Sequence, residues 1–370
     1  MTQFNAVDIF SGGGGLTVGL KRAGFNVSAA IELNTDAYST YKSNHPETSV
    51  FNQDVREISG ASIQAITPTG QVHLLSGCPP CQGFSSLTAK YKKNDPRNAL
   101  IKEMARLIEE TRPLAVMMEN VPGILTRGKR RFNALLKELE VLGYIPTYDV
   151  LQVADYGVPQ FRKRLVLLAG LGFRIPLPTA THSNEPGSKL PKWRTVRQAI
   201  AGLGKPMTLD AAKTKGQPQD TDWHIVRTLS PANQKRIRAV KPGKSWWSIP
   251  SSLRPNCHKG NYRGFGNVYG RMRWGEVSPT ITGGCTTLSK GRFGHPSAHR
   301  TISVREAALL QTFPKDYLID TPHMDAACNI IGNALPCVFA EALARQCAKH
   351  IELHLSAMNR GANRSRATKG

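Results

Sequence analysis

The chain has 370 residues, enough for one sizeable hydrophobic core and, by size alone, for two domains. No run of roughly 18 apolar residues occurs, so the sequence argues against a membrane-spanning helix and we expect no membrane partner. Lysine and arginine number 49 against 26 aspartates and glutamates, and the formal net charge of +23 favours a polyanionic partner.

The seven cysteines form an odd, scattered set, which argues against a disulfide framework and for a reducing compartment. The sequence begins with a strand-like segment and not with a charged region followed by an apolar one. We therefore expect no secretory signal and a cytoplasmic location.

Short β-branched and aliphatic segments alternate with helical patterns through the first 178 residues. Strands are predicted over residues 6–10, 27–32, 72–76, 114–120, 148–154 and 164–170, and residues 52–55 would close a further strand. Helices are predicted over 16–23, 34–44, 98–111 and 129–142. This alternation predicts an α/β fold in which helices wrap a doubly wound, mostly parallel, Rossmann-like sheet.

After residue 178 the pattern gives way to short segments rich in turn residues, and helical periodicity returns at 303–310. A closing amphipathic helix over 335–353 is expected to dock on the first domain. We therefore predict a domain made of residues 1–178 plus 301–353, an inserted smaller irregular domain over 179–300, and a disordered basic tail over 354–370.

The inserted segment concentrates the positive charge. Between Thr181 and Arg300 there are 21 lysines and arginines against 5 acidic residues, and all five tryptophans of the chain lie there too. Cations interleaved with aromatic side chains are typical of nucleic-acid-binding domains, because the cations meet phosphates and other side chains reach base edges. A solvated basic face is the alternative interpretation.

A candidate nucleophile, Cys81, stands in a Pro-Cys-Gln loop directly after an apolar strand, and Glu119 lies near the end of another predicted strand. A cysteine thiolate that adds to C6 of cytosine makes C5 nucleophilic, and a protonated Glu119 could donate to N3. Cys78 and Cys81 also form a CxxC pair. Because no second pair completes a ligand set, we expect no metal, and two intervening prolines do not suit a redox dithiol.

Two guanidiniums, those of Arg162 and Arg164, stand two residues apart where the chain enters the strand predicted over 164–170. In an extended segment they lie on one side. One could meet O2 of a base and the other a phosphate, although such a pair alone is more typical of an exposed cationic strand end.

The first predicted strand leads into four glycines, residues 12–15, that open a helix. Backbone N–H groups there can approach a polar ligand closely. Glu32 closes the second strand, where a carboxylate can bind the ribose hydroxyls of a nucleoside, and Asp54 and Val55 could meet the amino group and face of an adenine. The alternatives are a plain tight turn or NAD. S-adenosylmethionine fits better, because the full GxGxxG and a hydride-transfer constellation are absent.

Six short motifs occur in a fixed order, at residues 8–15, 80–82, 119–121, 160–164, 300–314 and 331–336. In these motifs the chain resembles the cytosine-C5 DNA methyltransferases, and the resemblance covers nearly all of it outside the insert. The departures are small, with Lys163 where the family often has an acidic residue and Leu335 where valine is commoner.

The resemblance implies that Cys81 is the covalent nucleophile, that Glu119 contacts N3, and that Arg164, with Arg162, orients the cytosine and its flanking phosphate. It implies that residues 179–300 recognise the target and that the target base is flipped out of the duplex. The residues expected to line the S-adenosylmethionine pocket are Phe10, Gly12, Gly14, Gly15, Glu32, Asp54, Val55 and Asn333.

The compact chain is similar to prokaryotic or phage members that protect DNA from a partner endonuclease or act alone. We therefore expect double-stranded DNA as substrate, a cognate restriction endonuclease as a partner, and a monomer on the DNA. Two alternatives remain open: an RNA-directed relative that methylates tRNA, and a DNA-binding regulator with a silent active site.

Overall fold

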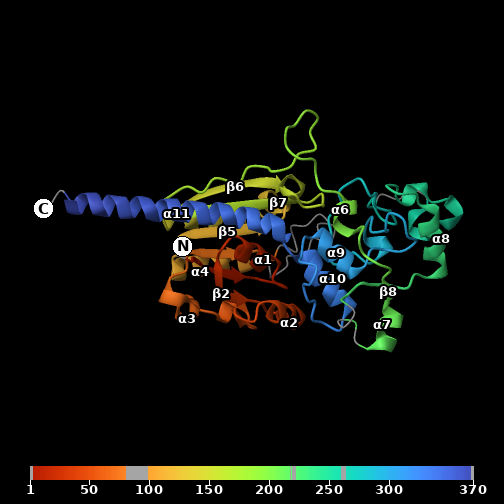
Figure 1. Cartoon of the computed structure of the whole chain (residues 1–370), viewed down its shortest axis with the longest axis horizontal. Coiled ribbons are helices and arrows are strands. Elements are labelled where there is room, and N and C mark those ends of the chain that lie inside the picture. Colours follow the sequence, from red (N-terminus) through yellow and green to blue (C-terminus); the bar gives the residue numbers. More distant parts are fainter. Residues whose placement is uncertain (1–2, 81–98, 217, 219–221, 260–263, 368–370) are drawn as a thin grey trace.

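The structure is a computed structural model that describes residues 3–80, 99–216, 218, 222–259 and 264–367, with side chains described up to Arg360. Seven strands form one sheet in the order β3-β2-β1-β4-β5-β7-β6 (Figure 1). They are β1 (Asn5–Ile9), β2 (Asn26–Ile31), β3 (Ser49–Phe51), β4 (Leu74–Gly77), β5 (Ala115–Asn120), β6 (Tyr144–Gln152) and β7 (Lys163–Leu171).

Strands β1 to β5 pair in parallel, and β7 is antiparallel to both of its neighbours, β5 and β6. The predicted doubly wound, mostly parallel α/β fold is thus confirmed. Because parallel strands point the same way, the segments that follow β1, β2, β4 and β5 all leave from one edge of the sheet. Ligands of open α/β sheets bind outside this edge.

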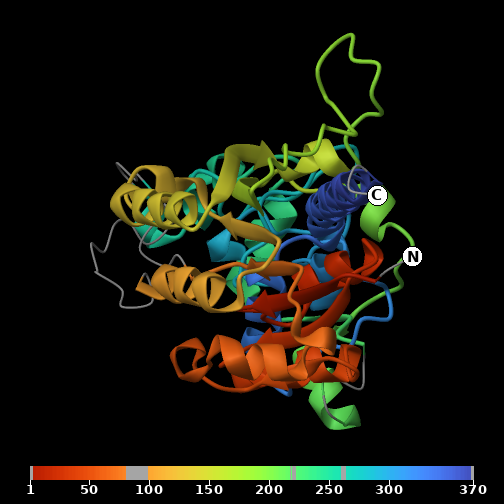
Figure 2. The ribbon, with the colours of Figure 1, turned by 90° about the vertical axis from the view of Figure 1, so that its left-hand side faces the viewer.

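Helices cover both faces of the sheet, as Figure 2 shows. One face packs on α3 (Gly60–Ile66), α4 (Ile101–Thr111) and α5 (Lys129–Val141), and the other on α1 (Gly15–Arg22) and α11 (Cys337–Ala367). Alternation within β1 explains the two layers, because Val7 and Ile9 enter the first core and Ala6 the second. Helix α2 (Thr35–Asn44) begins at Asn34, whose side chain accepts the N–H of Ala37.

The insert contains short elements joined by long irregular segments. They are α6 (Val196–Ile200), β8 (Met207–Thr208), α7 (Leu209–Lys215), β9 (Ile225–Val226) and α8 (Pro231–Ala239), followed by several single 3₁₀ turns. One core cluster joins insert residues such as Trp223 and Phe293 to α9 (Val304–Leu310) and α10 (Met324–Asn333). The predicted boundary at residue 300 therefore runs through this cluster, and the division into domains stays a prediction.

The predicted disordered tail over 354–370 is wrong for most of its length. Helix α11 continues to Ala367 and extends beyond the rest of the molecule (Figure 1). One stretch of the described chain, Met324–Arg360, is apolar and long enough to cross a membrane, but 61% of its most apolar window is buried. It consists of α10 and α11, whose apolar residues belong to the cores described above.

A second correction concerns the third strand. It ends at Phe51, so residues 52–55 lie outside it, and Asp54 caps a 3₁₀ turn, Val55–Glu57. The short polar segment after the strand forms a turn, which the Asp54 side chain stabilises by accepting a hydrogen bond from the N–H of Arg56.

Candidate active site

The glycine loop after β1 has one open position and several packed ones. Phe10 and Gly12 have φ angles of 60° and 55°. A Cβ at Gly12 would meet no atom within 4 Å, whereas one at Gly14 would lie 2.5 Å from the Tyr317 hydroxyl and one at Gly15 3.0 Å from the Leu335 carbonyl. Gly12 thus leaves room for a ligand, and the other two glycines allow the loop to pack on the C-terminal segments.

Glu32 follows β2 and binds the glycine loop. Its carboxylate accepts the N–H of Gly12 at 2.8 Å and the N–H of Asn34 at 2.7 Å. Burial raises the pKa of Glu32, although these N–H groups oppose the rise. The structure therefore brings together Gly12 and Glu32, the two predicted residues best placed to hold a ribose.

The other predicted pocket residues have different surroundings. Hydrogen bonds from Arg56 hold the carboxylate of Asp54 and lower its pKa to about 2. Val55 is buried in the core with the helices of one sheet face, and Asn333 is exposed at the end of α10. Their contacts with a cofactor stay predictions.

Glu119 and Arg164 form the centre of the catalytic edge. Glu119 lies near the end of β5 and is 8% exposed. The Nε of Arg164, in the antiparallel neighbour β7, lies 2.5 Å from Oε1 of Glu119, as an ion pair without good hydrogen-bond geometry. The guanidinium therefore lies against the carboxyl group that is predicted to contact N3.

The predicted nucleophile Cys81 lies outside the described residues. The chain that leads to it is described up to Pro80, and the carbonyl of Pro79 accepts a hydrogen bond of 3.2 Å from the side chain of Asn120. The nucleophile loop therefore begins beside the residue that follows Glu119.

Arg162 has a different environment from the one predicted. It is 3% exposed, and its Nη1 donates to the carbonyls of Ile281 at 3.0 Å and Gly332 at 3.2 Å. A guanidinium buried against two carbonyls joins the sheet to the insert and to α10. The predicted contact of Arg162 with the base or its flanking phosphate stays a prediction.

Comparisons with known proteins address the family directly. Residues 4–349 match the family model described as C-5 cytosine-specific DNA methylase. The chain belongs to this family. It is 36% identical to the Type II methylase M.HgiDII of Herpetosiphon aurantiacus over 351 residues, covering 94% of this chain and 95% of that protein. It is 32% identical to the Type II methyltransferase M1.HphI of Haemophilus parahaemolyticus, covering 93% and 86%.

Solved structures agree on the fold. A prophage-encoded E. coli protein described as a DNA modification methyltransferase superposes with a TM-score of 0.69 and 23% identity, covering 94% of this chain and 99% of that one. The methyltransferase EhMeth of Entamoeba histolytica gives a TM-score of 0.60 with 17% identity, covering 95% and 99%. The predicted family and enzyme class, a DNA cytosine-C5 methyltransferase, are confirmed.

Two residues of this methyltransferase site were not predicted. Asp8 is fully buried in β1, and burial raises its pKa to about 7, although a hydrogen bond of 2.7 Å from the Thr17 hydroxyl opposes the rise. Burial and the carboxylates of Glu119 and Asp8 raise the pKa of the Cys78 thiol. Two sequence signals could have indicated Asp8, namely its charge inside an apolar strand and its place at the start of the first motif.

The tryptophans of the methyltransferase insert do not share one role. Trp223 and Trp246 are 0% and 1% exposed and belong to hydrophobic cores, Trp193 and Trp274 are partly buried, and Trp247 is 60% exposed. The two buried tryptophans therefore stabilise the fold, and the tryptophan content of the insert alone does not distinguish core from surface.

Proposed function

We propose that this methyltransferase transfers a methyl group from S-adenosylmethionine to C5 of cytosine within a specific sequence of double-stranded DNA. The observation that carries the proposal is the meeting of Glu119, Arg164 and the start of the Cys81 loop at one edge of the sheet. These groups come from three neighbouring strands, β4, β5 and β7. A base reached this deep in the protein must leave the duplex, so the proposal includes base flipping.

The pocket beside this edge fits S-adenosylmethionine. Gly12 leaves open space, and Glu32 presents a carboxylate on two backbone N–H groups at the end of the adjacent strand. Carboxylates at this position bind ribose hydroxyls in nucleoside sites. When bound, S-adenosylmethionine supplies an electrophilic methyl group, and Glu32 with Gly12 would fix the nucleoside so that this group faces the base.

Cys81 begins the chemistry as a thiolate that adds to C6 of the flipped cytosine, and the displaced electron pair moves through the ring towards C5 and N3. Glu119 stabilises N3, and Arg164, already beside it, offers its remaining N–H groups to O2. C5 then forms a bond to the methyl carbon, and the methyl–sulfur bond breaks with its electron pair left on the sulfur. Transfer of the C5 proton to water and departure of the thiolate from C6 restore the aromatic ring.

Two partners are inferred, DNA from the positive charge of the insert and an endonuclease from the names of the relatives. The positive insert supplies cations for DNA phosphates. Because the relatives described above are named as Type II methylases, we infer that a cognate endonuclease acts on the same sequence. We place the enzyme in the cytoplasm, acting as a monomer on DNA.

Mapping of 5-methylcytosine at base resolution tests the proposal. DNA is taken from a methylation-free bacterial host that expresses the wild type or Cys81→Ala. We expect methylation in one short sequence context in the first and none in the second. Methylation of host tRNA in place of DNA would favour the RNA-directed alternative, and soluble protein that binds DNA without methylating either would favour the silent regulator.

A mechanism-based trap tests the nucleophile separately. A duplex with 5-fluorocytosine at the mapped target cannot lose its C5 substituent as a proton, so the covalent adduct persists. We expect a denaturant-stable protein–DNA species with the wild type and none with Cys81→Ala. An adduct that persists in the variant would exclude Cys81 as the nucleophile.

A further inference from the structure

Trp247 is a large aromatic side chain held outside the core of the insert. It lies in the 3₁₀ turn Trp246–Ser248, and 60% of its surface is exposed. Its ring stacks on that of Trp246 with centroids 3.8 Å apart and an angle of 27° between the planes. One face of the indole is therefore supported by protein, and the exposed part of the ring is available to stack on a planar ligand.

The turn under Trp247 is fixed by several contacts. Trp246 is 1% exposed and packs with Val240, Ile249 and Val268 in a small separate core. Arg254 donates to the carbonyls of Ile249 at 3.0 Å and Trp247 at 3.1 Å, and its guanidinium lies 5.5 Å from the Trp246 ring. The Trp247 ring is thus held in place before any ligand binds, which lowers the entropy cost of binding.

The sequence segment that contains Trp247 carries only positive formal charge. Residues 223–275 contain eleven lysines and arginines and no aspartate or glutamate. Several of these cations are exposed, namely Lys235, Arg238, Lys241, Lys244 and Lys259. Phe265, which is 53% exposed, precedes Gly266, where an added Cβ would lie 3.6 Å from the Trp247 indole nitrogen.

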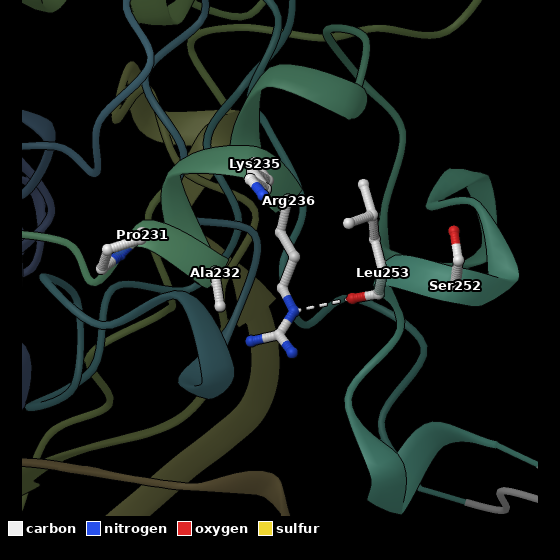
Figure 3. A pocket seen from close by; sticks show the side chains of 6 residues that line it. All are labelled: Pro231, Ala232, Lys235, Arg236, Ser252 and Leu253. Atoms are coloured by element: carbon white, nitrogen blue, oxygen red, sulfur yellow. Dashed lines mark hydrogen bonds between the residues drawn. The ribbon is translucent and has the colours of Figure 1, made fainter.

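A hollow of about 270 Å³ lies in the same part of the insert, between α8 and the turn Ser251–Leu253 (Figure 3). Lys235 and Arg236 line it with Leu253, and Arg236 is fixed by a hydrogen bond of 2.8 Å to the Leu253 carbonyl. Lys235 has an exposed ammonium group. A rigid aromatic face and exposed positive charge in one segment of the insert match a polymer that offers both bases and phosphates.

We propose that Trp247 stacks on a nucleobase of the DNA substrate while neighbouring lysines, Lys235 among them, neutralise phosphates. The inference rests on the proposed function and assigns the base contact to one residue of the insert. Stacking on an aromatic side chain needs only the π-face of a base, so any base can take part. Trp247 therefore contributes affinity and holds a base-pair step that is partly unstacked. Contacts with base edges determine which sequence is recognised.

Titrations with a labelled duplex of about 30 base pairs separate stacking from charge. The duplex contains the sequence context that the mapping experiment identifies as the target. A mixed-sequence duplex is titrated in parallel, so that stacking is tested even if no target sequence is found. We expect Trp247→Ala to weaken binding of the motif duplex about tenfold with an unchanged salt dependence, and Trp247→Phe to retain most of the affinity. Trp247→Lys adds a cation without a ring and should not restore binding.

Lysine variants provide the matched comparison. Lys235→Ala should weaken binding to both duplexes alike and reduce the slope of log K against log salt by about one. Lys349→Ala removes an equally exposed lysine from α11, outside the insert, and should change neither quantity. Restoration of affinity by Trp247→Lys, with a steeper salt dependence, would show that the position senses charge and would overturn the inference.

Fluorescence gives a readout that does not depend on methyl transfer. Stacking on a base should quench Trp247, so DNA should quench the wild type much more than Trp247→Phe. Equal quenching of both, or wild-type affinity in Trp247→Ala while methylation proceeds, would refute the stacking and leave the proposed function standing. Failure of the wild type to bind either duplex would refute both.

Discussion

Gln160 and Gln311, 151 residues apart in the sequence, are joined by a side-chain hydrogen bond of 2.6 Å. Both are 0% exposed. Gln311 also donates to the carbonyl of Ile331 at 2.7 Å, and Gln160 accepts the N–H of Ile281 at 2.9 Å. The amide pair thereby connects the segment that leads into β7, the insert and α10, alongside the buried guanidinium of Arg162.

Replacing either glutamine with leucine should destabilise the protein by about 1–3 kcal/mol, because buried groups lose a partner. Urea denaturation measures the change. The double variant Gln160→Leu/Gln311→Leu should cost less than the sum of the two single variants, since the two amides then disappear together. Strict additivity would contradict a shared bond, and exposed Gln71→Leu is the control.

Glu119→Gln should lower kcat by about 10²–10⁴-fold, because the variant cannot supply the proton or the negative charge that the N3 contact needs. The KM for DNA should change much less, since the duplex is held elsewhere. Steady-state kinetics with the mapped duplex measure both quantities. Glu138→Gln, at an exposed position of α5, should have wild-type kinetics; a similar loss there would mean that the effect is not local.

Glu32→Gln should weaken S-adenosylmethionine binding by at least about tenfold, because the carboxylate then no longer accepts the ribose hydroxyls or both N–H groups of its loop. Calorimetric titration with S-adenosylmethionine alone measures the change without any DNA. Exposed Glu57→Gln, on the turn after β3, is the matched control. Unchanged affinity in Glu32→Gln would remove this carboxylate from the proposed pocket.

Asp8 should make stability depend on pH. Its pKa rises from an ordinary 3.8 to about 7 on burial, so between these values the folded protein holds a proton that the unfolded chain has lost. The contribution of Asp8 to the free energy of unfolding is at most about 4 kcal/mol. It is fully present below about pH 4 and is lost as the pH rises through about 7. The difference in unfolding free energy between the wild type and Asp8→Asn should follow this curve.

The comparison with Asp8→Asn is needed because buried histidines act in the opposite direction. Burial lowers the pKa of His45 and of His295 to about 4, so their contributions grow as the pH rises from about 4 to 6.5. Both variants contain these histidines, and the difference isolates Asp8. A flat difference between pH 4 and 8 would contradict the buried, protonated state.

Gly19→Ala should destabilise the protein by about 1–3 kcal/mol or more, because an added Cβ would lie 2.5 Å from Ala340 Cβ and 2.6 Å from the Glu341 nitrogen. The contact joins α1 to α11, and the backbone atoms cannot rotate away. Gly202→Ala, where a Cβ would meet nothing within 4 Å, should be nearly neutral in the same denaturation series. Equal stability of both variants would contradict the close helix contact.

Periodicity and motif order predicted the sheet, most of its helices and the family, since alternation in strands such as β1 reflects the two cores directly. They did not predict which side chains would be buried. Arg162 looks like a surface residue by type, yet tertiary contacts bury it. The pairing of Arg164 with Glu119 depends on the antiparallel placement of β7, which a strand pattern does not encode.

The core shared by the insert with α9 and α10 bears on how new specificities could be engineered. An exchange of recognition segments between relatives at residues 179 and 300 would separate Phe293 and Trp223 from the helices that they were packed against. A chimaera with its second junction after α10, near Ala334, would transplant the cluster nearly whole. The transferable module is therefore longer than the variable segment of the sequence.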